Sequence, residues 1–356
     1  CYRPLRMVPG SGYPRLRAAG SLRQLWKPRD FFGFWLPFRA AANVLHCLLS
    51  ASLGEVSSGS ILMNRNHVST RFVVFVLALV GLAVGPPAVA EEPDPRPLKV
   101  LIVAGGCCHD YATQTRLLSR GLEARVNAAV EVIYNPDTST KATFPIYETD
   151  GWARDFDVII HDECSANVTE RPYVDRILKA HREGVPAVNL HCAMHSYRWG
   201  EFQKPVAPGA DNAAWYEMIG LQSTGHGPQS PIDVAYASHP ITTGLGDWTT
   251  INEELYNNIQ VYESATVLAS GKQRQKPRRR KNESAGDAAE PVEVTAVVAW
   301  VNEYGPKKTR IFSTSLGHNN ETVGDDRYLD LVARGLLWAA GKLADDGTPS
   351  SGYARK

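Results

Sequence analysis

Apolar and polar residues alternate along the chain in a pattern that predicts strands and helices from residue 98 onward. Four short runs have the nearly unbroken apolar character of parallel strands covered on both faces, namely residues 98–103, 130–134, 156–160 and 185–190. Between them, residues 113–127 and 169–182 carry apolar side chains at helical spacing. This alternation predicts an α/β fold with a doubly wound, mostly parallel sheet flanked by helices, in the flavodoxin-like strand order.

The pattern is less regular beyond residue 200. We expect a loop over residues 201–209, helices over 213–219 and 325–343, and strands over 232–236, 265–269, 294–301 and 310–315. Residues 271–290 contain seven Lys and Arg residues without apolar periodicity, which predicts a basic disordered loop. Residues 344–356 are expected to form a flexible tail. One α/β domain over residues 98–343 accounts for the rest.

The residues before this domain fall into two parts. Residues 1–62 are basic and lack a sustained period, and we expect them to be a disordered upstream extension from a mis-called gene start. Residues 63–90 combine Arg65 and Arg71, a 13-residue apolar run and a small-residue motif ending at Ala90, which is the pattern of a secretory signal peptide cleaved near Ala90. Because about 20 apolar residues are needed to span a bilayer, we expect no stable membrane anchor. The sequence therefore predicts export to the periplasm or the medium.

Net charge and cysteine content change this picture only slightly. The net charge of +1 gives no reason to expect a nucleic-acid partner, and the oligomeric state, a homo-oligomer included, is left open. Export implies an oxidising compartment, in which cysteines form disulfides. The exported part contains Cys107, Cys108, Cys164 and Cys192, for which three pairings exist, and the sequence does not choose among them.

Chemically reactive side chains follow three of the predicted strands directly. Residues 105–110 have the sequence GGCCHD, residues 161–164 the sequence HDEC and residues 191–195 the sequence HCAMH. In open parallel α/β sheets, ligands bind just beyond the carboxyl ends of the strands. We therefore expect the three strand ends to converge on one functional rim.

Imidazoles and carboxylates on one rim supply proton donors and acceptors for acid–base catalysis. The candidate catalytic residues are His109, Glu163, His191, Glu254 and His318. Two of them, Glu163 and Glu254, are candidates for an acid/base pair. By contrast, His181 on the polar face of a helix and His239 in a turn are expected to be structural.

A divalent metal such as Zn²⁺ is a variant of the same hypothesis. Zinc takes three or four His, Cys or carboxylate ligands. His109, His191 and His318 are the candidate ligands, with His195 as a further one. The chain contains no dense metal-binding motif such as HExxH, so the sequence establishes no cofactor and leaves the metal open.

Several further short motifs follow one another along the chain: residues 189–193 (NLHCA), 239–240 (HP), 252–256 (NEELY), 300–305 (WVNEYG), 315–318 (SLGH) and 336–341 (LLWAAG). With the first strand and its His109-Asp110 end, they resemble the ThuA-like (trehalose utilisation) family over residues 98–343. The resemblance implies a fold similar to class I glutamine amidotransferases. It also implies a carbohydrate-linked role, with trehalose-like or keto disaccharides as substrates, and it places the Glu254 segment over the site. From the imidazoles and carboxylates of the rim, we expect an enzyme that hydrolyses or isomerises such a carbohydrate.

A small-molecule carbohydrate is thus the expected partner, and aromatic rings near the rim are suited to stack on it. We expect Asp110, Tyr197, Trp199 and Tyr256 to bind substrate. Two alternatives remain. One is a sugar-binding protein without catalysis. The other is an amidohydrolase with Cys192 as nucleophile, His318 as base and Glu321 as orienting group, although the neighbours of Cys192 are not the glycines of a nucleophile elbow.

Overall fold

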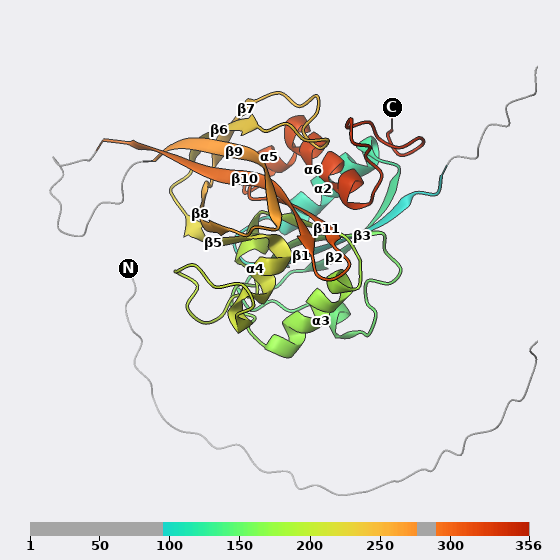
Figure 1. The fold of residues 1–356 in the computed structure, drawn as a ribbon, viewed down its shortest axis with the longest axis horizontal. Helices are drawn as coiled ribbons and strands as arrows, with labels where there is room; N and C mark the ends of the chain where they lie inside the picture. Colours follow the sequence, from blue (N-terminus) through green and yellow to red (C-terminus); the bar gives the residue numbers. More distant parts are fainter. Residues whose placement is uncertain (1–94, 276–289, 356) are drawn as a thin grey trace, which may run out of the picture. The chain divides into compact units, whose positions relative to one another are not determined.

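The structure, a computed structural model, describes residues 95–275 and 290–355 (Figure 1). The predicted upstream extension and signal peptide lie outside the described residues, as does most of the predicted basic loop. No helix within the described ranges is long and apolar enough to cross a membrane. The described part is built around one large sheet with helices packed on it.

The large sheet has nine strands in the order β2-β1-β3-β4-β11-β10-β9-β6-β7. The parallel half contains β2 (Ala128–Asn135), β1 (Leu98–Gly106), β3 (Val158–Cys164), β4 (Ala187–Leu190) and β11 (Thr309–Thr314). The antiparallel half contains β10 (Val292–Tyr304), β9 (Ala265–Gln275), β6 (Ser230–Tyr236) and β7 (Trp248–Glu253). The predicted α/β fold and its neighbouring first, third and fourth strands are confirmed, in a mixed sheet.

Helices cover both faces of the parallel half because its strands are apolar on both sides. Val100 and Ile102 of β1 pack in one core with α2 (Tyr111–Arg125) and α6 (Asp326–Ala339). The alternate residues Leu101 and Val103 pack in a second core with α3 (Arg171–Arg182) and α4 (Ala214–Ile219). Burial of every β1 residue except Lys99 explains the unbroken apolar run that identified this strand.

Several elements of the structure were not predicted. A second sheet pairs β5 (Leu221–His226) with β8 (Tyr256–Val261), and β7 extends the large sheet. Short helical turns also occur, namely α5 (Asn320–Val323) and 3₁₀ turns at Pro145–Glu148, His191–His195 and Asp211–Ala213. The missed strands are rich in Gln, Ser, Thr and Asn, so they lack the apolar alternation that marks a half-buried strand.

Two expectations about chain ends and loops require correction. Residues 271–275, which we expected in the basic loop, continue β9 and pair with β10 and β6. The expected flexible tail instead folds back on the domain. Leu343 bridges to Pro349, and Ala354 bridges to Val126 at the end of α2. Backbone pairing thus ties the tail to the domain, a feature that its polar composition does not reveal.

Candidate functional site

The carboxyl ends of β1, β3, β4 and β11 lie at one edge of the sheet. Gly106 at the end of β1 is opposite Cys164 at the end of β3, and Leu190 at the end of β4 is opposite Thr314 of β11. The segments after these strands therefore begin side by side. They carry the reactive residues that the sequence placed on one rim, and the structure brings four of the predicted site residues together there.

These four residues form what we call the His/Glu254 cluster: His109, His191, Glu254 and His318. The ring of His109 lies edge-on to those of His191 and His318, with centroids 4.9 and 4.6 Å apart. Oε2 of Glu254 is 3.3 Å from Nδ1 of His318 and 3.5 Å from Nε2 of His191. Four segments that are far apart in the sequence thus place three imidazoles around one carboxylate.

His191 is the most deeply buried histidine of the cluster. Its Nδ1 lies 2.6 Å from the carbonyl oxygen of Ser315. Because a carbonyl oxygen only accepts, Nδ1 carries a proton, and Nε2 is the nitrogen that faces Glu254. His191 also has a φ of +36°, in the left-handed region that L residues rarely adopt. The sharp turn after β4 therefore orients this imidazole toward the cluster.

His318 is held in place through its backbone by Glu253, the last residue of β7. The backbone N–H groups of His318 and Asn319 donate to the two carboxylate oxygens of Glu253, each over 3.1 Å. The His318 carbonyl accepts from Nε2 of Gln114 at 2.9 Å. The two adjacent glutamates therefore make different contacts: Glu253 accepts from the backbone at His318, and Glu254 contacts the imidazoles.

Charge interactions within the cluster favour an ionised carboxylate. Burial alone would raise the pKa of Glu254, but its interactions with the nearby imidazoles of His191 and His318 outweigh burial and hold that pKa well below its usual range. Burial would likewise lower the pKa of His318, but Glu254 and Glu253 outweigh it and raise that pKa. The cluster thus holds one ionised carboxylate between imidazole rings.

His109 connects the cluster to Cys192. Its Nδ1 is 3.3 Å from the His318 carbonyl oxygen, and its Nε2 is 2.9 Å from Sγ of Cys192. The contact with Cys164, with burial, raises the pKa of the Cys192 thiol despite the opposing effect of His109. The predicted triad is therefore not formed, because Cys192 contacts His109 rather than His318, and Glu321 is exposed.

Tyr256 lies at the cluster, as expected for a substrate-binding residue. Its ring stacks on His195 with a centroid separation of 4.2 Å and lies 4.7 Å from the His191 ring. Its hydroxyl points to Sγ of Cys192 at 3.8 Å. Only 1 % of the Tyr256 surface is exposed, so its ring packs against the histidines and does not offer an open surface for stacking on a sugar.

Glu163 does not join the cluster, so the expected acid/base pair with Glu254 is not assembled. Its side chain is fully buried, accepts from the Tyr147 and Tyr197 hydroxyls and lies 2.9 Å from Nδ1 of His161. Residues alternate between the two faces of a strand. Glu163 therefore faces the core under α3, while its neighbour Asp162 faces the opposite core.

Three predicted substrate-binding residues have structural contacts instead. Tyr197 is buried and donates to Glu163. Trp199 donates to Asp211 at 2.8 Å and lies beside Arg171, away from the cluster. Asp110 is exposed at the rim but caps α2, accepting from the backbone N–H of Thr113 at 3.1 Å. These contacts satisfy the polar groups that we expected to face a sugar.

The two histidines that we expected to be structural lie outside the cluster. His181 is not on an exposed polar face: it is fully buried, with Nε2 2.9 Å from Nε2 of His161 and Nδ1 2.7 Å from the Val185 carbonyl. Burial, with a contribution from His161, lowers its pKa to about 3. His239 lies in a turn as predicted, where its Nδ1 accepts from the backbone of Ile241.

Sequence reasoning missed two buried or rim polar residues, His226 at the cluster and Asp162 near Cys192. Nδ1 of His226, at the end of β5, lies 3.4 Å from Oε1 of Glu254. Asp162 is buried, and its Oδ2 accepts no hydrogen bond from the described residues. Burial, together with the nearby Cys192 and Glu163, raises the pKa of Asp162 well above the usual range. Strand alternation in β3 could have identified Asp162, whereas His226 required the unpredicted strand β5.

The cluster has the donor set of a divalent-metal site. Ligand atoms of His191, Glu254 and His318 all lie within 4.8 Å of one another, and so do those of His109, His191 and Cys192. Nε2 of His191 and Nδ1 of His318 are buried without a hydrogen-bond partner among the described residues. Such buried unsatisfied nitrogens are costly, and coordination of a cation would satisfy both.

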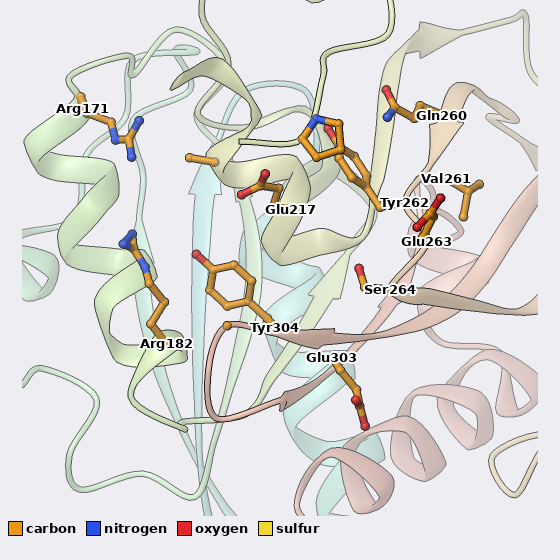
Figure 2. A pocket seen from close by; sticks show the side chains of 13 residues that line it. Arg171, Arg182, Glu217, Gln260, Val261, Tyr262, Glu263, Ser264, Glu303 and Tyr304 are labelled. Carbon is orange, nitrogen blue, oxygen red and sulfur yellow. The ribbon is translucent and has the colours of Figure 1, made fainter. Parts of the chain in front are cut away.

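Two cavities show where a ligand has room. One of about 390 Å³ adjoins the cluster and is lined by His226, Tyr256, Asn257 and Asn258, among others. Another of about 780 Å³ lies between α3, α4 and the end of β10, and Figure 2 shows Glu217 and Tyr304 among its lining side chains. Neither cavity is lined by a member of the cluster, but the first is lined by His226, whose Nδ1 lies 3.4 Å from Oε1 of Glu254, and by Tyr256, whose ring lies beside His191.

Solved structures with similar folds include two proteins described as ThuA-like. One, from Parabacteroides merdae, is 17 % identical with a TM-score of 0.49, over 73 % of this chain and 97 % of that chain. The other, from Bacteroides uniformis, is 15 % identical with a TM-score of 0.46, over 72 % and 95 %. A protein from Thermoplasma acidophilum described as a GMP synthase component is 12 % identical with a TM-score of 0.38, over 69 % and 96 %.

Comparison with known sequences identifies the family directly. Among curated protein sequences, no significant match to this chain is found. Residues 99–339, however, match the model of the ThuA family, which is described as trehalose utilisation. This match spans the whole α/β domain and confirms the resemblance drawn from its motifs. The chain therefore belongs to the ThuA (trehalose utilisation) family.

Proposed function

We propose that this protein is an exported enzyme that hydrolyses or isomerises a trehalose-like or keto disaccharide, with the His/Glu254 cluster as a metal-assisted acid–base site. Membership of the ThuA family supports a carbohydrate-related function in general. The observation that carries the proposal is the pair of buried, unpartnered imidazole nitrogens on His191 and His318, which flank the Glu254 carboxylate.

The proposed ligands of a divalent cation are His191, Glu254 and His318. Three protein ligands with an open position are typical of catalytic zinc. The hydrogen bond from His191 to a backbone carbonyl is the arrangement that orients metal-ligating histidines and fixes their tautomer. A bound divalent cation would polarise a sugar oxygen or lower the pKa of a water molecule.

His109 is the proposed acid–base residue. It is half-buried, its ring lies against both proposed histidine ligands, and the contact with the His318 carbonyl assigns its proton to Nδ1. Nε2 therefore has a lone pair, which lies against the Cys192 sulfur. His109 can accept a proton at Nε2 without breaking the hydrogen bond that orients the ring.

The cavity beside His226 and Tyr256 is the proposed sugar site. Its volume of about 390 Å³ falls within the range of small-molecule sites, about 300–1,000 Å³. The amide side chains of Asn257 and Asn258 line it, and such groups suit the hydroxyl-rich surface of a disaccharide. His226 connects this space to the cluster because its Nδ1 lies near Glu254.

A second candidate function uses Cys192 as a nucleophile, with His109 rather than His318 as its base. The 2.9 Å contact between Nε2 of His109 and Sγ of Cys192 favours it. Burial of the thiol and its raised pKa weigh against it, because the thiolate is the reactive form. Replacing Cys192 by Ser would abolish activity in this case, whereas the metal-assisted site retains measurable turnover.

Export is proposed from residues 63–90 alone, whose pattern is that of a cleaved signal peptide. The test is expression of the full chain in a bacterial host, followed by fractionation and N-terminal sequencing. A mature protein beginning near Glu91 in the periplasm or medium supports export. An uncleaved chain retained in the cytoplasm contradicts it.

The function is tested by turnover of trehalose and of its 3-keto derivative by the purified protein. Wild type is compared with His191→Ala and with His239→Ala, a control that removes a histidine outside the cluster. Turnover that is lost in His191→Ala and kept in His239→Ala supports the proposal. Binding of either sugar without turnover would make the chain a binding protein and would contradict it.

A further inference from the structure

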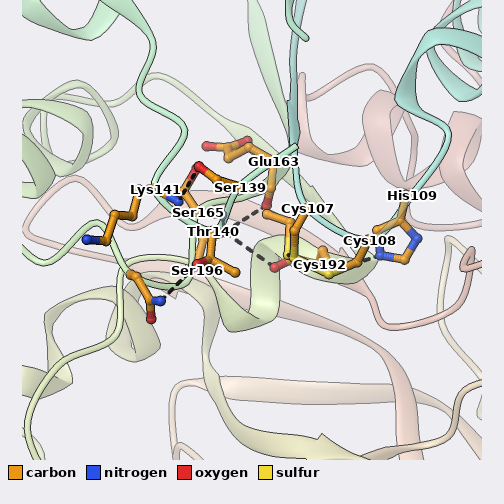
Figure 3. Close-up of a disulfide and its surroundings, with 12 residues drawn as sticks. Cys107, Cys108, His109, Ser139, Thr140, Lys141, Glu163, Ser165, Cys192 and Ser196 are labelled. Carbon is orange, nitrogen blue, oxygen red and sulfur yellow. Dashed lines mark hydrogen bonds between the residues drawn. A yellow bond between two sulfur atoms is a disulfide. The ribbon is translucent and has the colours of Figure 1, made fainter. Parts of the chain in front are cut away.

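A disulfide joins the adjacent residues Cys107 and Cys108 just after β1 (Figure 3). Cys108 is exposed and Cys107 is half-buried, so the bond is accessible at the rim. Neither residue belongs to the His/Glu254 cluster, and sulfur atoms joined in a disulfide do not act as thiolate ligands. The chemistry of this bond is therefore separate from the proposed metal site.

The free thiol of Cys164 lies against this disulfide. Its Sγ is buried and lies 3.3 Å from Sγ of Cys107. Gly106 permits the approach, because its φ is +93° and a Cβ there would lie 2.3 Å from the Cys164 carbonyl oxygen. The Cys107 backbone N–H also donates to that oxygen, at 3.4 Å. The ends of β1 and β3 thus hold a thiol against one sulfur of a surface disulfide.

We propose that Cys107, Cys108 and Cys164 form a thiol–disulfide exchange site that reacts with small external disulfides at Cys108. A thiolate breaks a disulfide by attacking one of its sulfur atoms. Cys164 is the attacking residue because its sulfur already contacts Cys107, and Cys108 is the point of entry because it is the exposed member of the three.

The internal step is balanced without any oxidant. Cys164 gives up its proton to solvent, and its thiolate attacks Sγ of Cys107. The Cys107–Cys108 bond breaks, and a Cys107–Cys164 bond forms. Cys108 leaves as a thiolate and takes up a proton from solvent, so one disulfide and one thiol are present before and after. The result is a buried disulfide and an exposed free thiol.

The external step uses that exposed thiol. The Cys108 thiolate attacks one sulfur of a small disulfide, a mixed disulfide forms on Cys108, and the other half of the reagent leaves as a thiolate that is then protonated. The other free cysteine among the described residues, Cys192, does not offer this route, because it is buried and its sulfur contacts Cys164, His109 and Tyr256. Cys108 is therefore the residue at which an external disulfide reacts with the exchange site.

The test is disulfide mapping of the full-length protein after incubation with oxidised glutathione. Thiols are trapped with an alkylating agent under denaturing conditions, and unreduced tryptic peptides are identified by mass spectrometry. Trypsin leaves Cys107 and Cys108 on one peptide and Cys164 and Cys192 on two others. A bond between the adjacent cysteines and a Cys107–Cys164 bond are therefore distinguishable.

In wild type, the glutathione adduct on Cys108 is expected in the same molecules as the Cys107–Cys164 bond. In Cys164→Ser that bond is absent, and the adduct should fall by at least about tenfold. Cys192→Ser, the control for loss of another buried thiol, should keep the wild-type pattern. An adduct that is undiminished in Cys164→Ser would overturn the proposal.

A second variant keeps the proposal testable if Cys164→Ser does not fold. Cys108→Ser leaves Cys107 and Cys164 as two thiols in contact. Oxidised glutathione should convert them into a Cys107–Cys164 disulfide, with release of two molecules of the reduced form. Glutathione retained on Cys107 without a bond to Cys164 would show that the two sulfurs do not react, and would also overturn the proposal.

Discussion

The Nδ1–H of His191 donates to the carbonyl oxygen of Ser315 over 2.6 Å, and this contact turns Nε2 of the same ring toward Glu254. Nε2 faces Glu254 in a buried position and has no hydrogen-bond partner among the described residues. Ser315 immediately follows β11, the strand beside β4, so the sheet itself sets the orientation of the imidazole. The site therefore depends on strand order rather than on a local motif.

Loss of the Glu254 charge is expected to lower the pKa of His318. In wild type, Glu254 and Glu253 outweigh burial and raise that pKa. In Glu254→Gln only Glu253 remains, so His318 should lose its proton at lower pH than in wild type. NMR titration of the histidine ring protons in metal-free protein measures the shift. An unchanged His318 titration would show that the two side chains do not interact.

His181 is expected to make the protein less stable in acid. Its folded pKa of about 3 lies below the unfolded value of about 6.5, so the unfolded chain binds the extra proton between these values. Stability is therefore lost as pH falls through this window, by up to about 1.4 kcal/mol per pH unit for this one group. Urea unfolding at several pH values should show a shallower acid slope in His181→Gln. Equal slopes in both proteins would contradict this assignment.

Asp162 is expected to act in the opposite direction. Burial raises its folded pKa above the unfolded value, so the folded state binds the extra proton and stability falls as pH rises above about 4. Asp162→Asn removes this ionisable group. The stability of the variant relative to wild type should therefore increase between about pH 5 and pH 8. A constant difference across that range would show that Asp162 ionises normally.

Gly335 is expected to be required for the packing of α6 on the sheet. Alanine in a helix interior is normally favoured over glycine by about 1 kcal/mol. Here, however, a Cβ would lie 2.4 Å from Cδ1 of Phe312 in β11. Overpacking of this kind costs about 1–3 kcal/mol, so Gly335→Ala should lower the free energy of unfolding. Gly246→Ala, where a Cβ meets nothing within 4 Å, is the control and should be nearly neutral.

The sequence predicted those parts of the fold in which burial produces an unbroken apolar run. Every residue of β1 except Lys99 is buried, which makes the strand easy to recognise. In β3, however, the apolar run ends at Ile160, while the buried strand continues through His161 to Cys164. Buried polar residues have no distinctive periodicity, so the predicted strand was too short. Because the predicted strand ended at Ile160, its alternation was not used to decide which core Asp162 and Glu163 each face, and Glu163 was wrongly expected at the cluster.

The sequence predicted which strand ends carry the residues of the site, but it did not predict which of these residues contact one another. His109, His191 and His318 were found because each follows a recognisable strand. The position of His226 depends on β5 and β8, whose polar composition conceals them. The bond between Cys107 and Cys108 was equally inaccessible, since four cysteines allow three pairings and only the folded chain separates them.

The central claim, a divalent cation held by His191, Glu254 and His318, is tested most directly by metal stoichiometry. Metal-free protein is loaded with zinc, freed of excess metal, and analysed for metal per chain beside His191→Ala, His318→Ala and the control His239→Ala. We expect one zinc ion per chain in wild type and in the control, and at least about a tenfold loss in both cluster variants. Wild type that retains no zinc, or cluster variants that retain as much as the control, would contradict the claim.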